Sequence, residues 1–216
     1  HIVRSTEEPD SNITAGVEEV LNGIEAHFPT HSDTDWILAL NAAGSGVNEG
    51  QKTAFLSNLL LDTADFAHDN VGNPATMAKA AIALTSLGID ARKVKDLYGG
   101  EDIDLVKKIG LLYDAKTAPR AQYSAPYILS LFDLPGYDVP TGSRSTRAEL
   151  IDAILGSEDD WGFDGAGMVL PALAPYYTDT SSANGISDGK CNEIRTVINR
   201  TLDKISQEQT VDGSLG

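Results

Sequence analysis

Gln209-Thr-Val-Asp212-Gly213-Ser214-Leu215-Gly216 is the stretch of sequence that decides the fold. Asp and Ser accept hydrogen bonds from free backbone amides at a helix start, and Gly permits a tight turn, so the stretch predicts a corner between two helices. The segment before it predicts an amphipathic helix running to about residue 207, marked by Ile194, Val197, Ile198, Leu202 and Ile205 at helical spacing. We therefore expect the stretch to close one helical hairpin of a series that continues beyond Gly216.

Two kinds of helical segment alternate through the rest of the chain. The first kind is amphipathic and covers residues 13–24, 52–68, 103–112 and 147–155, with a short piece at 91–97. The second kind is apolar or small on nearly every side and covers residues 36–43, 74–87, 122–132 and 164–177. Comparable leucines in the second kind are spaced by 44, 47 and 42 residues: Leu40, Leu84, Leu131 and Leu173. A period in this range with two helices per unit is typical of stacked helical hairpins.

These two kinds of segment predict two layers of helices. A helix that is apolar nearly all round must be covered on several sides, whereas an amphipathic helix covers a layer with one face. We therefore expect an all-α fold with the small-apolar helices inside and the amphipathic helices outside. Residues 1–11 are polar and predict a tail, so the single domain spans residues 12–216. Periodicity alone does not separate an open solenoid from a closed ring.

Acidic, glycine-containing corners precede two of the small-apolar segments. Ser32-Asp33-Thr34-Asp35-Trp36 precedes the first, and Asp159-Asp160-Trp161-Gly162-Phe163-Asp164-Gly165 precedes the fourth. Asp and Ser side chains at these positions predict caps for the incoming helix, and the aromatic side chains are expected to pack between successive units.

These motifs resemble a known superfamily. The closing stretch from Gln209 to Leu215 is similar to the Gln-x-x-Asp-Gly-Ser-Trp repeat of the terpenoid cyclase and protein prenyltransferase α/α toroids, with Leu215 at the tryptophan position. Residues 194–216 also resemble the matching segment of the vitamin B12 carriers transcobalamin and intrinsic factor. The corner at 160–164 and the helix at 167–177 resemble toroid domains of Gram-positive bacterial surface proteins. The resemblance implies an α/α toroid that is incomplete in this chain, with about four and a half hairpins.

The catalytic motifs of that superfamily are not matched. Its cyclases use an Asp-x-Asp-Asp acid, whereas the acidic runs here are Glu158-Asp159-Asp160 and Glu101-Asp102-Ile103-Asp104. Cyclases also line their cavity with aromatic side chains to stabilise carbocations, and aromatic residues make up only 6% of this chain. We expect the Asp159-Asp160 pair to be a solvated cap.

A zinc site of the prenyltransferase kind is also not matched. The only cysteine, Cys191, is preceded by Asp188-Gly189-Lys190 rather than by an Asp two residues upstream. All four histidines precede it in the sequence: His1, His27, His31 and His68. We therefore expect Cys191 to be an inert, partly buried residue, and we predict no metal, no cofactor and no enzymatic activity.

Composition limits the cellular locations and the classes of partner that we expect for this chain. The 216 residues include 16 basic and 32 acidic ones, a formal net charge of −16 that repels nucleic acid and anionic lipid. No apolar run is long enough to span a membrane, and one cysteine forms no disulfide framework. The start at His1-Ile-Val-Arg4 fits a chain derived from a longer precursor. We expect a non-catalytic extracellular or cell-surface module of a bacterial protein, with a structural, adhesive or binding role beside other domains of a longer polypeptide.

Two other functions are kept as alternatives. One is a small-molecule carrier, with a corrinoid as the ligand implied by the resemblance to the B12 carriers. The other is an enzyme of the terpenoid cyclase or prenyltransferase type. The partner is accordingly a protein or a small molecule, with no nucleic acid and no membrane insertion.

The candidate ligand-binding residues lie where the small-apolar helices are expected to begin. The N-terminal ends of such helices present free N–H groups and the positive end of the helix dipole, which favour anionic or polar ligands. In the alternative interpretation, the tryptophans and tyrosines among them only pack between repeats. The candidates are Trp36, Thr76, Tyr123, Tyr127, Trp161, Asp164 and Met168.

Overall fold

The structure is a computed structural model that describes residues 30–178 and 185–208. Every regular element in these two ranges is a helix, and the one strand-like feature there is an isolated bridge between Val94 and Ile103. The all-α prediction is therefore confirmed for the described part of the chain. The expected tail at 1–11, the expected helix at 13–24 and the closing stretch at 209–216 lie outside the described residues.

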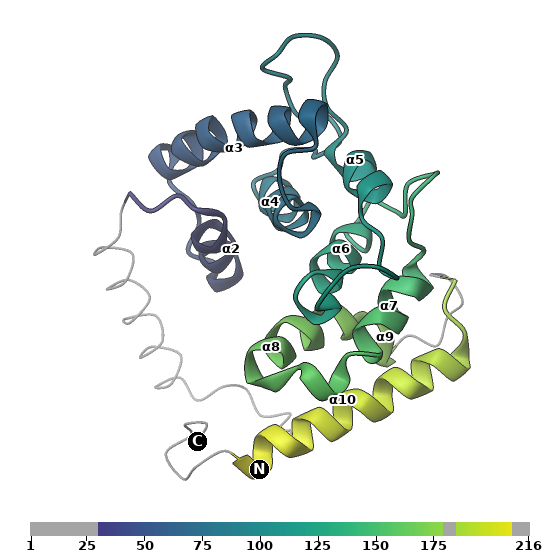
Figure 1. The fold of residues 1–216 in the computed structure, drawn as a ribbon. Coiled ribbons are helices and arrows are strands. Elements are labelled where there is room, and N and C mark those ends of the chain that lie inside the picture. Colours follow the sequence, from purple (N-terminus) through teal and green to yellow (C-terminus); the bar gives the residue numbers. More distant parts are fainter. Residues whose placement is uncertain (1–29, 179–184, 209–216) are drawn as a thin grey trace.

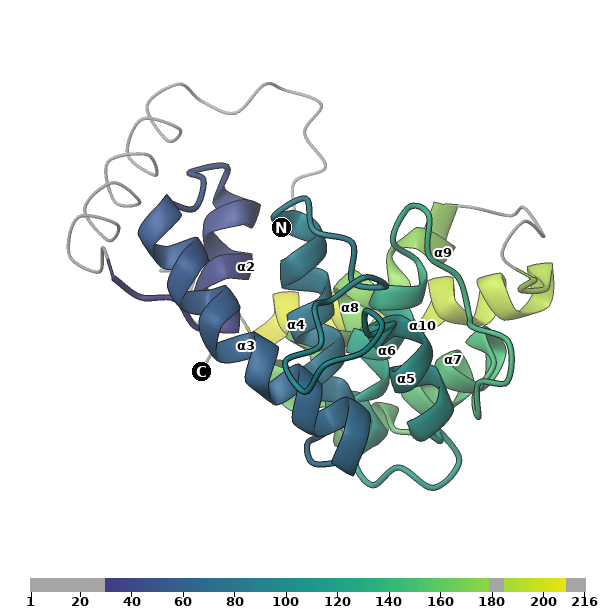
Figure 2. The same ribbon diagram turned by 90° about the horizontal axis from the view of Figure 1, so that it is seen from above.

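The longer helices form two rows, as Figure 1 shows. The inner row consists of α2 (Thr34–Ala43), α4 (Pro74–Ser86), α6 (Ala125–Phe132) and α8 (Gly162–Leu173), and each of these helices packs against the next. The outer row consists of α3 (Glu49–Asp69), α5 (Leu105–Leu112), α7 (Arg147–Leu155) and α10 (Asp188–Glu208). Figure 2 shows the same helices from above. The rows curve together, so the inner helices follow the inside of an arc.

Short helices connect the rows. The 3-10 helices η1 (Ala121–Tyr123) and η2 (Glu158–Asp160) precede α6 and α8, and α9 (Pro175–Thr178) follows α8. The predicted fourth small-apolar segment is thus divided at Ala174, because Pro175 has no backbone N–H to continue the hydrogen-bond pattern of α8.

Small side chains let the inner helices approach closely. In α4, alanines at 75, 78, 80, 81 and 83 are buried together with Met77 and Leu84, so this helix is covered on most of its circumference. It lies between α2 and α6, with α5 covering it from the outer row. The alternation of small-apolar and amphipathic segments therefore corresponds to the position of each helix in the structure.

Several helix starts carry the expected caps. The Asp33 carboxylate accepts a hydrogen bond from the Trp36 amide at 3.0 Å, and Pro74 is the first residue of α4. Asp104, part of the acidic run at 101–104, caps α5 by accepting a bond from the Lys107 amide at 2.9 Å. That acid therefore has a structural role at a helix terminus.

Two local predictions were wrong. Asp159 and Asp160 do not cap α8; they lie in η2, and Trp161 occupies the cap position without a side-chain hydrogen bond. The piece at 91–97 is a series of turns and not a helix. Carboxylates compete with helix formation there, because Asp90 accepts a bond from the Arg92 amide and Asp96 accepts one from the Tyr98 amide.

Candidate functional site

Polar contacts join neighbouring inner helices at their C-terminal ends. A side-chain amide and a hydroxyl join α2 to α4, two hydroxyls join α4 to the loop after α6, and a tyrosine of α9 donates to the carboxylate that follows α6. The pairs are Asn41 Nδ2 with Ser86 Oγ at 2.8 Å, Thr85 Oγ1 with Tyr137 OH at 2.9 Å, and Tyr176 OH with Asp133 Oδ2 at 2.6 Å. Hydrogen bonds between side chains thus connect the helices of the inner row at this end.

Lys79 makes the corresponding link at the N-terminal ends. Its ammonium group forms an ion pair with Asp35 of α2 and lies 5.3 Å from the centre of the Tyr127 ring of α6. One side chain of α4 therefore contacts both neighbouring inner helices. Farther along the row, the Gln122 side chain donates to the carbonyl of Asp160 at 3.5 Å.

Lys79 is a functional candidate that the sequence interpretation missed. It is the one charged residue of α4, and its side chain retains 23% of its exposure, whereas that of Asp35 retains 72%. A single lysine inside an otherwise uncharged, alanine-rich helix was the available signal. Its pairing with Asp35 could not be predicted, because the two residues meet only when α2 and α4 pack together.

Five of the predicted binding residues are exposed or half-buried. Thr76 and Lys79 are three residues apart and share a face of α4, and Tyr127 meets that face from α6. Thr76, Tyr123 and Asp164 are exposed, and Tyr127 and Met168 are half-buried. We call this set, with Asp35 and Lys79, the inner face.

The two tryptophans have other surroundings. Trp161 is buried, and its indole N–H donates to the carbonyl of Ile154 at 3.2 Å and to the hydroxyl of Ser157 at 3.3 Å, which fixes the corner to the end of α7. Trp36 is half-buried, with its ring tilted against that of His31 at 5.7 Å between centres. For Trp161 the contacts are those of a residue that packs between units.

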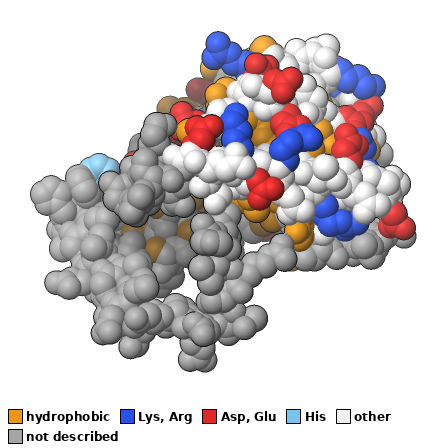
Figure 3. Space-filling view, turned by 90° about the horizontal axis from the view of Figure 1, so that it is seen from below, with side chains coloured by type: hydrophobic (Ala, Val, Ile, Leu, Met, Phe, Trp, Pro, Cys, Tyr) orange, Lys and Arg blue, Asp and Glu red, His pale blue; other side chains and the backbone are white. Residues whose placement is uncertain are grey.

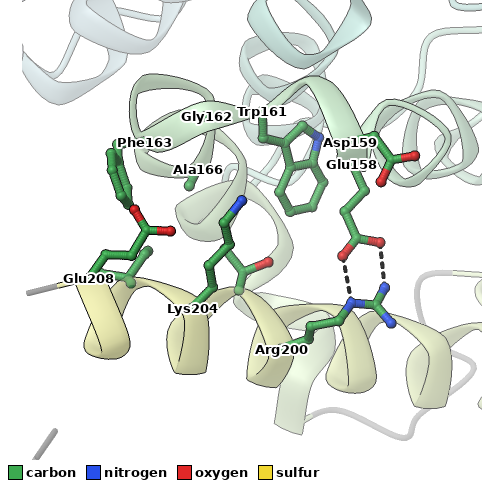
Figure 4. A pocket seen from close by; sticks show the side chains of 11 residues that line it. Glu158, Asp159, Trp161, Gly162, Phe163, Ala166, Arg200, Lys204 and Glu208 are labelled. Carbon is green, nitrogen blue, oxygen red and sulfur yellow. Dashed lines mark hydrogen bonds and ion pairs between the residues drawn. The ribbon is translucent and has the colours of Figure 1, made fainter. Parts of the chain in front are cut away.

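A pocket lies beside Trp161. It is bounded by the corner before α8 and by the C-terminal half of α10, and it encloses about 320 Å³. In Figure 4, Trp161 and Phe163 approach from the corner, while Arg200, Lys204 and Glu208 rise from α10. The volume is at the lower end of the range of about 300–1,000 Å³ that is typical of small-ligand sites. It suits a small ligand or a few side chains better than a corrinoid.

Charge in this pocket is only partly paired. The guanidinium group of Arg200 binds both carboxylate oxygens of Glu158 at 2.8 and 2.5 Å, and this contact raises the pKa of Arg200. Lys204 also lines the pocket, and within residues 30–178 and 185–208 it has no ion-pair partner. Asp159 and Glu208 line the pocket as well, so it combines aromatic walls with charges of both signs.

A third cluster lies at the outer row. The Nε2 atom of His68 is 2.7 Å from a carboxylate oxygen of Asp96, and this contact lowers the pKa of Asp96. The Tyr98 hydroxyl donates to Asp65, and the rings of Tyr98 and His68 are 5.5 Å apart. The cluster fastens the loop after α4 to α3.

The remaining surface is mixed in charge. Figure 3 shows acidic and basic side chains interspersed over the described part of the face seen from below. In the described residues, no group of three or more His, Cys, Asp and Glu side chains is arranged to hold a metal ion, and Cys191 is buried. No helix of the described part has both the length and the apolar character that crossing a membrane requires. Comparisons with protein-family models, with curated proteins and with solved structures found no match to this chain.

Proposed function

We propose that the chain is a non-catalytic binding module, built as a partial α/α toroid, that recognises a basic segment of a partner protein. The observation that carries the proposal is the inner face, where Lys79 joins Asp35 of one neighbouring helix to Tyr127 of the other. An array whose inner helices are tied together in this way presents its exposed side chains on a rigid surface.

The toroid arrangement is supported by the order of the helices. Inner and outer helices alternate along the chain, and both rows curve in the same direction (Figure 1). Small residues fill the contacts between inner helices, which is what a tightly curved inner row requires.

The chemistry of the inner face favours a basic partner. Asp35 and Asp164 are exposed carboxylates, and Tyr123 and Tyr127 offer aromatic rings that attract Lys and Arg side chains. The excess of 16 acidic over basic residues, the formal net charge of −16, adds a long-range attraction for such a partner. Lys79 holds the Asp35 carboxylate and the Tyr127 ring in place. A cation of the partner would contact the same two groups from the solvent side.

Titration calorimetry with a hexalysine peptide tests this function, with hexaglutamate as the charge control. We expect hexalysine to bind and hexaglutamate not to bind. Replacement of Asp164 by Asn should weaken hexalysine binding about two- to fivefold, the usual effect of losing one exposed ion pair. The same change at Asp203, an exposed carboxylate of α10, serves as the matched control. Equal effects of the two changes would assign the binding to general charge and contradict the inner face as the site.

Cobalamin is titrated under the same conditions to test the small-molecule alternative. We expect no binding at high micromolar cobalamin. Binding of cobalamin without binding of hexalysine would replace the proposed function by small-molecule carriage.

We further propose that the module acts at the cell surface or outside the cell. The acidic composition and the single buried cysteine are compatible with that setting. Labelling of intact host cells with a membrane-impermeant biotin reagent should modify the protein. Labelling only after lysis would contradict this location.

A further inference from the structure

The loop after α4 and the C-terminal half of α3 form a surface at the outer row. In Figure 1 this loop projects beyond the outer row, next to the end of α3. The isolated bridge closes the loop with backbone hydrogen bonds of 3.0 and 2.7 Å between Val94 and Ile103. The contact between His68 and Asp96 and the hydrogen bond from Tyr98 then hold the loop against α3. The two segments therefore make one fixed surface.

Apolar side chains are concentrated on this surface. Six large apolar side chains are exposed in residues 30–178 and 185–208, and four of them belong to these two segments. The four are between 45 and 61% exposed: Leu61, Val71, Leu97 and Tyr98. We call them the rim patch. Exposed apolar side chains that gather at one place are typical of protein interaction sites.

Three contacts bring the rim patch together. The Tyr98 hydroxyl donates to the Asp65 carboxylate, so the tyrosine lies along α3 with Leu97 beside it in the loop. Leu61 is one helical turn before Asp65 and shares its face of α3. The Val71 amide donates to the Asp65 carbonyl at 3.4 Å, which places Val71 at the end of the same helix.

The charge around the rim patch is negative. Residues 58–71 and 96–104 contain neither Lys nor Arg, and their seven acidic residues are Asp62, Asp65, Asp69, Asp96, Glu101, Asp102 and Asp104. The hydrogen bond to Asp65, desolvation and the neighbouring charges of Asp69 and Asp96 raise the pKa of Tyr98. The most exposed ring of the rim patch therefore lies among carboxylates.

Two lysines lie at the base of the loop, where they flank the residue that forms the bridge. Two acids flank its bridge partner, so the antiparallel pairing sets Lys93 opposite Asp104 and Lys95 opposite Asp102. These lysines offset the two acids at the base. The exposed carboxylates of Asp62 and Asp69 on α3 remain as the surplus charge beside the rim patch.

We infer that the rim patch docks a basic amphipathic segment of a partner protein. Leu61, Leu97 and Tyr98 receive the apolar side chains of that segment, and the carboxylates on α3 receive its Lys or Arg side chains. The exposed face of the Tyr98 ring attracts a cation in the same place. This surface is separate from the inner face, and the inference does not depend on the function proposed for that face.

Titration calorimetry with a peptide of leucine and lysine tests the docking. The peptide is about 14 residues long and has its leucines at amphipathic helical spacing, and a scrambled peptide of the same composition is the control. We expect the amphipathic peptide to bind more tightly. Leu97→Asn should weaken its binding about five- to tenfold, the usual effect of removing one partly buried leucine from a contact. Leu111→Asn, at an exposed leucine of α5, should leave the binding unchanged.

Equal binding of the two peptides would overturn the inference, and so would equal effects of the two leucine substitutions. Sedimentation of the chain alone tests for a second copy as the occupant, and we expect a monomer. A dimer that Leu97→Asn dissociates would likewise overturn the inference.

Carboxyl footprinting locates the bound peptide. Carbodiimide and glycine ethyl ester label exposed carboxylates, and mass spectrometry of the digested protein measures the labelling of each one. We expect the peptide to reduce the labelling of Asp62 and Asp69 and to leave that of Asp203 unchanged. Protection confined to Asp35 and Asp164 would place the peptide on the inner face. That result would support the proposed function and overturn the present inference.

Discussion

Thr63 carries a hydroxyl group that is fully buried and, among residues 30–178 and 185–208, has no hydrogen-bond partner. A buried hydroxyl without a partner destabilises the folded state, so Thr63→Val should raise the free energy of unfolding by about 1 kcal/mol in a urea titration. Thr85→Val is the matched control, because the Thr85 hydroxyl donates to the Ala81 carbonyl at 2.8 Å and meets Tyr137. This control should lose about 1 kcal/mol. Similar losses for both variants would contradict the assignment of Thr63.

Glu149 links stability to pH. The ammonium group of Lys116, together with hydrogen bonds from Thr146, lowers the pKa of Glu149 from 4.5 to about 2. Because the pKa is lower in the folded state, this stabilisation is complete above pH 4.5 and is lost as the pH falls toward 2.

Glu149→Gln keeps an acceptor for the helix cap and removes the charge. The variant should therefore lose stability at pH 7 and differ little from the parent near pH 2, as measured by denaturation midpoints across this range. Asp203→Asn, at an exposed site, is the control and should show no such convergence. A constant difference between Glu149→Gln and the parent at all pH values would contradict the role given to the charge.

Sequence patterns predicted individual residues best where the contact is local. The cap at Asp33 and the start at Pro74 follow from neighbouring residues, and the structure confirms both. The linking role of Lys79 was missed, because its partners come from two other helices. Asp159 and Asp160 were predicted to cap α8 because acidic residues are common at helix starts. In the structure they belong to the 3-10 helix η2, which ends before α8 begins.

At the scale of single elements, α5 illustrates how a helix depends on the loop that crosses it. Gly110 is buried in α5, and a Cβ atom there would collide with the side chain of Ser143, with Pro140 also in contact. The loop at 140–144 also binds directly to the helix, since the Arg144 amide donates to the Gly110 carbonyl at 3.0 Å.

Gly110→Ala should therefore lower the free energy of unfolding by about 1–3 kcal/mol, the usual cost of overpacking. Gly167→Ala is the control, because a Cβ at this exposed position of α8 meets no described residue within 4 Å. That change should raise stability by about 0.5–1 kcal/mol, the helix preference of alanine over glycine. Destabilisation by both changes to the same extent would contradict the close contact at Gly110.

Helices could be predicted where the helical spacing of their apolar residues was clear. Long segments such as 52–68 and 74–87 showed helical spacing over several turns, and both are helices in the structure. The piece at 91–97 had only a few apolar residues at helical spacing, and local hydrogen bonds to Asp90 and Asp96 decided its conformation. Short patterns of this kind are ambiguous because one turn of side-chain hydrogen bonds outweighs them.

At the scale of the whole molecule, the order of the rows was predictable and the inner face was predictable only in part. The helix starts indicated Thr76, Tyr127 and Asp164, none of which is buried. Trp161 is instead buried at the corner, because an indole there fills the space between α7 and α8. The curvature of the rows arises from packing between units, for which a single unit carries no sequence signal.

A continuous inner row is the structural premise of the inner face. Hydrogen–deuterium exchange of the full chain, followed by mass spectrometry, measures it directly, because amides in helices covered on several sides exchange only when the array opens. We predict the slowest exchange in α4 and α6, which lie between inner neighbours, and faster exchange in the outer helices α3 and α10. Exchange in α4 and α6 as fast as in α3 and α10 would contradict the two-row arrangement.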